Sequence, residues 1–116
     1  MAESAAKATG KYLRTTPQKA RLVVDLIRGK DANEALNILR FTQKAAARDV
    51  EKVLQSAIHN AEDLHEDVDV DKLYVSEAQV GDGPRMKRIR PAPMGRAFRY
   101  QRRMAHIRIH VEERAE

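Results

Sequence analysis

The chain has 116 residues, no cysteine and a formal net charge of +5 at pH 7. This length predicts a single domain, residues 1–116, and the lack of cysteine excludes a disulfide scaffold and a cysteine-ligated zinc site. The chain begins with polar residues, and its longest aliphatic cluster, Leu22–Val24, is followed at once by Asp25. We therefore expect no secretory signal, no membrane span and a cytoplasmic location.

Three helices are predicted in the first half of the chain. Thr15–Pro17 forms a helix start, apolar residues follow at helical spacing, and Gly29 supplies a terminator. Asp31 and Glu34 have the spacing of a capping box at the start of a short second helix. Thr42 is expected to cap a third and longer helix. Its apolar stripe would be Ala46, Val50, Val53, Leu54, Ala57, Ile58 and Ala61.

The spacing of apolar residues changes to two in the second half, which predicts strands. In residues 72–80 one face would hold Leu73 and Val75, and the other face Tyr74, Ser76 and Ala78. Residues 105–111 alternate strictly between apolar and polar positions. These two strands are expected to pair antiparallel, and the stretch around Lys7–Leu13 to add a third strand.

A strongly basic stretch lies between the two later strands. Arg85–Arg103 contains one lysine and seven arginines but no acid, and Pro91–Gly95 in its middle has the composition of a turn. Upstream of Ala105 the alternation loses its apolar face, so a strand that continues there leaves the core. Gly81–Pro84 is expected to bulge the outgoing strand near its base.

The predicted fold is therefore α+β. Three helices pack on a small antiparallel sheet of about three strands, and a long extended β-hairpin arm leaves the sheet. The body would comprise about residues 5–80 and 104–113, and the arm about residues 81–103.

Charge is distributed unevenly along the chain, and this asymmetry points to nucleic acid. Residues 61–80 have a net charge of −6, whereas residues 81–103 have a net charge of +7. A charged loop that only protects an edge strand needs one or two charges. The excess of arginine over lysine favours bidentate phosphate contacts. The candidate contacts on the arm are Arg85, Lys87, Arg88, Arg90, Arg96, Arg99, Arg102 and Arg103.

A second basic patch surrounds the predicted start of the first helix. Arg14, Lys19 and Arg21 flank this start, where backbone N–H groups and the helix dipole favour a phosphate. Lys7 and Lys11 extend the patch. For each of these residues, ordinary surface charge is an open alternative.

No catalytic or metal site is predicted, and no cofactor is expected. His106 and His110 have a spacing that joins two metal ligands on a helix, but on a strand it separates them by about 13 Å. The serines lie in no nucleophile elbow, and the chain has no glycine-rich phosphate loop. These features favour a binding protein over an enzyme.

The motifs together resemble large-subunit ribosomal protein family twenty-two, bacterial type. The similarity extends from about Lys7 to Glu112. The residues that carry it are Tyr12–Arg14, Pro17–Arg21 and Ile27–Lys30 in the first half, then Lys87–Arg88, Arg90–Pro91, Gly95–Ala97 and His106–Ile107.

This resemblance implies a structural rRNA-binding protein of the large ribosomal subunit, which supports assembly of the subunit and the architecture of its tunnel. The body would lie on the subunit surface, beside neighbouring ribosomal proteins. The arm would pass through rRNA to the wall of the nascent-peptide exit tunnel, close to the nascent peptide. The tip residues at that wall would be Arg90, Pro91, Ala92, Pro93, Met94 and Gly95.

One alternative comes from the arm itself. Some architectural DNA-binding proteins bend DNA with Pro-tipped basic β-arms that enter the minor groove. Such proteins usually need a dimer to present two arms, and the predicted body offers no surplus apolar face for one. We therefore expect no obligate homo-oligomer and favour RNA over DNA.

Overall fold

A computed structural model describes residues 6–64, 69–91, 93–95 and 97–113, without the side chains at positions 93 and 98–100. The elements in chain order are β1 (Ala6–Leu13), α1 (Pro17–Asp25), α2 (Ala32–Phe41), α3 (Ala46–Leu64), β2 (Leu73–Pro91) and β3 (Ala97–Glu113). Short 3-10 turns, η1 (Val70–Lys72) and η2 (Pro93–Gly95), precede β2 and connect β2 to β3. This order confirms the predicted α+β fold.

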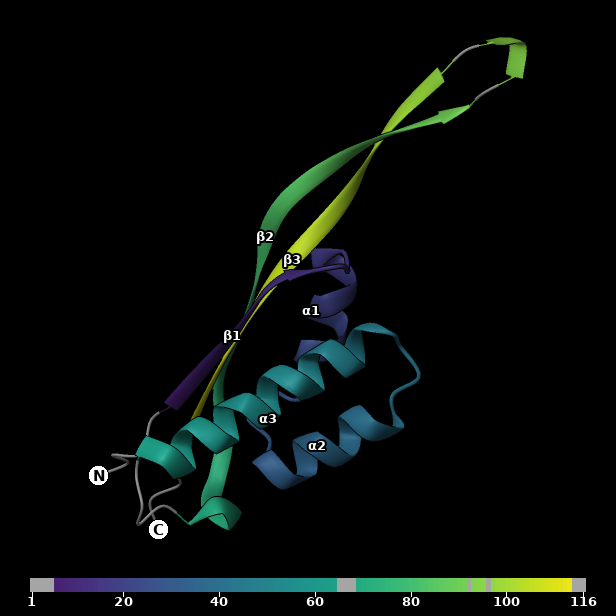
Figure 1. Ribbon diagram of the computed structural model, residues 1–116. Coiled ribbons are helices and arrows are strands. Elements are labelled where there is room, and N and C mark those ends of the chain that lie inside the picture. Colours follow the sequence, from purple (N-terminus) through teal and green to yellow (C-terminus); the bar gives the residue numbers. More distant parts are fainter. Residues whose placement is uncertain (1–5, 65–68, 92, 96, 114–116) are drawn as a thin grey trace.

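The three strands form one antiparallel sheet in the order β1-β3-β2. The pairing of β2 with β3 confirms the predicted hairpin, and the pairing of Ala6 with Val111 makes β1 the predicted third strand. The helices lie against one face of this sheet, and in Figure 1 the other face is not covered by a helix.

The core lies between the helices and the covered face of the sheet. On β3 the alternating residues Ala105, Ile107, Ile109 and Val111 are fully buried, as their period of two predicts. The predicted stripe of α3 is buried against them. Burial of this apolar surface is the main contribution to the stability of the body.

The ends of the helices follow the predicted local signals only in part. Thr16 caps α1 through an Oγ1 that accepts a hydrogen bond from the Lys19 N–H at 3.3 Å. Gly29 has the predicted positive φ, 75°, but it ends the turn that follows α1, whose own C-cap residue is Leu26. Asp31 is the N-cap residue of α2, which confirms the predicted start of this helix, but its side chain makes no capping hydrogen bond.

Thr42 ends a helix instead of beginning one. It is the C-cap residue of α2, and its hydroxyl donates to the Ile38 carbonyl at 2.6 Å. This bond occupies the hydroxyl on the preceding helix. α3 begins at Ala46, so the prediction that Thr42 caps the third helix is wrong.

A β-bulge corrects the predicted faces of β2. Val75 pairs with Val111 and Glu77 pairs with His110, so Ser76 is an extra residue on its strand. Its hydroxyl donates to the His110 carbonyl at 3.2 Å. The extra residue reverses the alternation, and Ala78 is buried in the core instead of lying on the face opposite Val75.

The β2–β3 hairpin continues far beyond the helices (Figure 1). The molecule measures 66 × 25 × 17 Å, and its radius of gyration is 17.3 Å, against about 13 Å for a compact chain of this length. A second register shift lies between Asp82 and Arg85, which confirms the bulge predicted from Gly81–Pro84. The hairpin therefore bends at the point where it leaves the body.

Candidate nucleic-acid interface

The register of the hairpin places cations on both faces of the arm. Arg85 pairs with Arg103, and Met86 pairs with Arg102. Successive residues of a strand point to opposite faces, so Arg85 and Lys87 share one face while Arg88 shares the other with Met86. The basic residues named here are all exposed: Arg85, Lys87, Arg88, Arg102 and Arg103.

No acidic residue occurs from Gly83 to Arg103, so the arm beyond its root contains no carboxylate of its own to neutralise its cations. Arg85 donates to the Gln101 amide oxygen at 3.2 Å, and Arg88 lies 3.7 Å from the Met86 sulfur. Arg103 forms an ion pair with Asp82 at 3.2 Å, at the root of the arm. Because like charges on opposite strand positions repel, an external polyanion would stabilise this hairpin.

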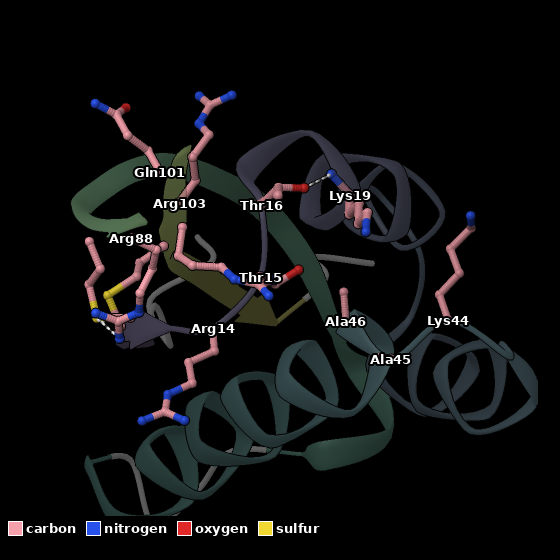
Figure 2. Close-up of a pocket in the computed structure, with 13 residues that line it drawn as sticks. Arg14, Thr15, Thr16, Lys19, Lys44, Ala45, Ala46, Arg88, Gln101 and Arg103 are labelled. Atoms are coloured by element: carbon pink, nitrogen blue, oxygen red, sulfur yellow. Dashed lines mark hydrogen bonds between the residues drawn. The ribbon is translucent and has the colours of Figure 1, made fainter. Parts of the chain in front are cut away.

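An open cleft of about 760 Å³ lies at the root of the arm, between the arm and the body. Three segments line it: the turn from β1 into α1, the residues before α3, and the base of the hairpin. The lining includes six cations, Arg14, Lys19, Lys44, Arg88, Arg102 and Arg103. Figure 2 shows Arg14, Lys19, Lys44, Arg88 and Arg103 around this cleft.

The cleft brings together residues that are far apart in the sequence. Arg14 and Lys19, from the predicted patch at the start of α1, share it with three of the arm cations. Thr15 and Thr16 add hydroxyl groups, which also hydrogen-bond phosphate oxygens. Parts of the two patches that were predicted separately thus meet in one concave basic surface.

Other predicted residues lie outside this cleft. Arg85, Lys87 and Arg90 are exposed along the arm, and Lys11 and Arg21 are exposed on the body. Arg96 lies outside the described residues, and for Arg99 the structure describes only the backbone.

The described tip residues form a tight, exposed turn. Met94 has a φ of 64° and Gly95 a φ of 71°, and the Met94 side chain is 96% exposed. Pro91 is the last residue of β2 and is exposed. Ala92 and the side chain of Pro93 lie outside the described residues.

Lys44 is a member of the cleft that sequence reasoning missed. It lies in the short connection between α2 and α3, and in sequence it is one exposed lysine among several. No motif or spacing marks it. It joins the cleft only because the start of α3 packs beside the hairpin root.

Tyr12 has an unusual conformation near the same root. Its φ is 59°, where a bulky side chain is rarely found, at a register shift between Gly10 and Leu13. Such a residue costs about 1–3 kcal/mol of backbone strain. The Tyr12 N–H donates to Nδ1 of His106 at 3.1 Å, and the two rings meet edge to face with centroids 5.1 Å apart.

The described residues contain neither a metal-binding cluster nor a membrane-spanning helix. Within the described parts of the chain, no three His, Cys, Asp or Glu residues are grouped closely enough to hold a metal ion. His106 and His110 lie on a strand, as their sequence context predicts. No helix among the described residues is long and apolar enough to cross a membrane.

Comparison with known proteins identifies the family. The family described as "Ribosomal protein L22p/L17e" matches residues 8–112. The chain is 66% identical over 108 residues to "Large ribosomal subunit protein uL22" of Solibacter usitatus, which covers 93% of this chain and 96% of that protein. It is 51% identical over 110 residues to the protein of the same name from Clostridium perfringens, which covers 95% of this chain and 98% of that one. The resemblance found in the sequence motifs is therefore confirmed, and the chain belongs to the ribosomal protein L22p/L17e family.

Proposed function

We propose that this protein, a structural component of the large ribosomal subunit, binds the subunit's rRNA through its arm and through the cleft at the root of the arm. The observation that carries the proposal is the convergence of Arg14, Lys19 and Lys44 with the base of a hairpin that contains no acid from Gly83 to Arg103. Such a surface suits contact with a polyanion and does not suit packing against an apolar protein surface.

Binding along the arm would be electrostatic and independent of base sequence. Same-face neighbours on a strand are about 6.8 Å apart, so Arg88 and Arg90 begin a ladder of charge along one face. Each phosphate that they neutralise releases counterions, which makes affinity fall steeply with salt. Arginine also presents a planar fork that fits two phosphate oxygens at once.

The cleft would hold a segment of RNA backbone against the body. A concave surface with charge of one sign focuses its electric field, so the six cations act together on a ligand that enters. Because Arg14 and Lys19 belong to the body while Arg88 and Arg102 belong to the arm, such a ligand would also fix the angle between the two.

The tip would lie at the wall of the nascent-peptide exit tunnel. Family membership supports this position, and so does the shape of the arm, whose tip residue Met94 is almost fully exposed. A weakly charged turn, Pro91–Gly95, beyond basic flanks suits a surface that meets a passing peptide without holding it. The body would lie at the subunit surface among neighbouring ribosomal proteins, and the chain would act as a monomer in the cytoplasmic ribosome. Its arm would support subunit assembly and tunnel architecture.

The test compares purified bacterial large-subunit rRNA with duplex DNA at matched salt, and measures the mass of the free protein in solution. We expect a monomer that binds rRNA more tightly than DNA, with an affinity that falls steeply as salt rises. Equal affinity for both nucleic acids from a tight dimer would overturn the proposal in favour of an architectural DNA-binding protein.

A further inference from the structure

Tyr12 occupies a backbone conformation that suits glycine, yet its side chain does not enter the core. The φ of 59° lies in the left-handed region, and the side chain is 60% exposed. The preceding Gly10 and the following Leu13 belong to the ladder with β3, whereas Tyr12 lies in the irregular step between them. Burial therefore does not account for an aromatic residue here.

The contact with His106 holds the ring in place without covering it. The rings are perpendicular, so His106 occupies at most one face of the phenol ring. The Tyr12 N–H bond to His106 Nδ1 fixes the backbone of the same residue. A rigid aromatic ring with a face left to solvent has the geometry of a stacking platform.

The surroundings of the ring are basic. Lys11 is adjacent in sequence and exposed, and Arg14, two residues later, lines the cleft at the arm root. Arg108 is exposed and lies on the same face of β3 as His106, because the two are separated by one residue. This is the face of the sheet that no helix covers in Figure 1.

We propose that Tyr12 stacks on an unpaired base of the RNA that the cleft and arm bind. The inference rests on the proposed function, and it adds a base contact to an interface otherwise made of phosphate contacts. Single-stranded bases that stack on aromatic side chains are a common mode of RNA recognition, and neighbouring cations hold the adjacent phosphates. His106 would act as the positioning residue that orients the ring.

Fluorescence can detect such stacking directly, because the chain contains no tryptophan. In the full-length chain with Tyr12→Trp, saturation with purified bacterial large-subunit rRNA is expected to remove most of the tryptophan emission. The matched control is Tyr74→Trp. Tyr74 is half-buried, donates to Glu112 at 3.1 Å, and pairs with β3 six residues from His106, about 20 Å along the strand. Its emission should change little.

Affinity for the same rRNA then separates stacking from a structural role. Tyr12→Leu should weaken binding about tenfold, whereas Tyr12→Phe should stay within about twofold, since a stacked base needs the ring and not the hydroxyl. Tyr12→Gly should lose affinity like the leucine variant while melting no lower than the wild type, because glycine relieves the strain at φ 59°.

Two outcomes would overturn the stacking of Tyr12 but leave the proposed function intact. One is a Tyr12→Leu variant that binds rRNA as tightly as the wild type. The other is unquenched emission from a Tyr12→Trp chain that does bind rRNA. A Tyr12→Gly variant that melts lower with unchanged affinity would assign the ring a structural role and overturn the inference in the same way. Failure of the wild-type chain to bind rRNA would instead overturn the proposed function itself.

Discussion

Strand β3 runs without interruption through two different environments. In the body, Ile107 and Ile109 on this strand are fully buried beneath the helices, whereas in the arm Gln101 and Arg102 are exposed. Both parts have the same backbone hydrogen-bond ladder with β2. The body is held by apolar burial, and the arm has only its ladder and its side-chain contacts, which are marginal for an isolated two-stranded ribbon. We therefore expect a ligand that binds the arm to stabilise it more than it stabilises the body.

Removing the arm should separate the two regions most clearly. Replacing residues 86–102 with Asn-Gly joins the paired Arg85 and Arg103 through a two-residue turn suited to a hairpin. Because most of the clustered cations are lost, we expect affinity for large-subunit rRNA to fall at least about a hundredfold. The melting temperature of the body should change by only a few degrees. Filter binding and circular dichroism would measure the two effects.

Melting of the shortened protein is the informative part of that experiment. A control that exchanges residues 86–102 for an uncharged hairpin of equal length distinguishes lost charge from lost length. Unfolding of the helices in the Asn-Gly variant would show that the stability of the body depends on the arm.

Two isoleucines in the hairpin allow the same comparison at single residues. Ile107 is fully buried in the body, and Ile89 is 70% exposed on the arm. We expect Ile107→Ala to lower the free energy of unfolding by about 2–5 kcal/mol, since it leaves a cavity in the core. Ile89→Ala should cost no more than about 0.5 kcal/mol. Urea denaturation of both variants measures these values, and equal losses would mean that the arm packs against the body.

Most of the fold could be predicted because its determinants are local. The period of two in β3 and the apolar stripe of α3 each specify one buried face, and both are confirmed. The cap at Thr16 and the terminator at Gly29 follow from the chemistry of single residues. The position of Ala78 could not be predicted, because the bulge at Ser76 depends on a register that only the paired strand sets.

The site was predictable in composition but not in shape. The arm could be predicted as a binding element because it is basic and contains no acid. Arg14 and Lys19 could be predicted because they lie at a helix start. Lys44 has neither signal, because it reaches the cleft through the packing of the helices. The backbone conformation of Tyr12 could not be predicted either, since nothing in the neighbouring residues indicates a positive φ at a tyrosine.

Two glycines on the strands that flank β3 should respond differently to alanine: Gly10 on β1 pairs with Ile107, and Gly81 on β2 pairs with His106. A Cβ on Gly10 would lie 2.7 Å from Cγ2 of the buried Val53, a branched side chain with little freedom to move. Gly10→Ala should therefore cost about 1–3 kcal/mol of unfolding free energy. A Cβ on Gly81, where the arm begins, meets nothing within 4 Å, so Gly81→Ala should change stability by less than about 0.5 kcal/mol. Thermal melts of both variants measure this difference in stability. A larger loss of stability in Gly81→Ala than in Gly10→Ala would mean that the tighter packing is at the arm root.

The smallest expected effect tests whether the cleft joins body and arm in one interface. Lys44 lines the cleft, whereas Lys52 is an exposed lysine on α3 outside it. If Lys44 contacts a phosphate, Lys44→Gln should make the dependence of log affinity on log salt less steep. The slope should decrease in magnitude by about 0.9 if the phosphate belongs to a duplex, or by about 0.7 if it belongs to a single strand. Lys52→Gln, with the same change of charge, should leave the slope unaltered. A decrease of the same size in both variants would mean that net charge alone governs binding. No decrease in either would mean that Lys44 contacts no phosphate. Either result would contradict the cleft as an RNA contact.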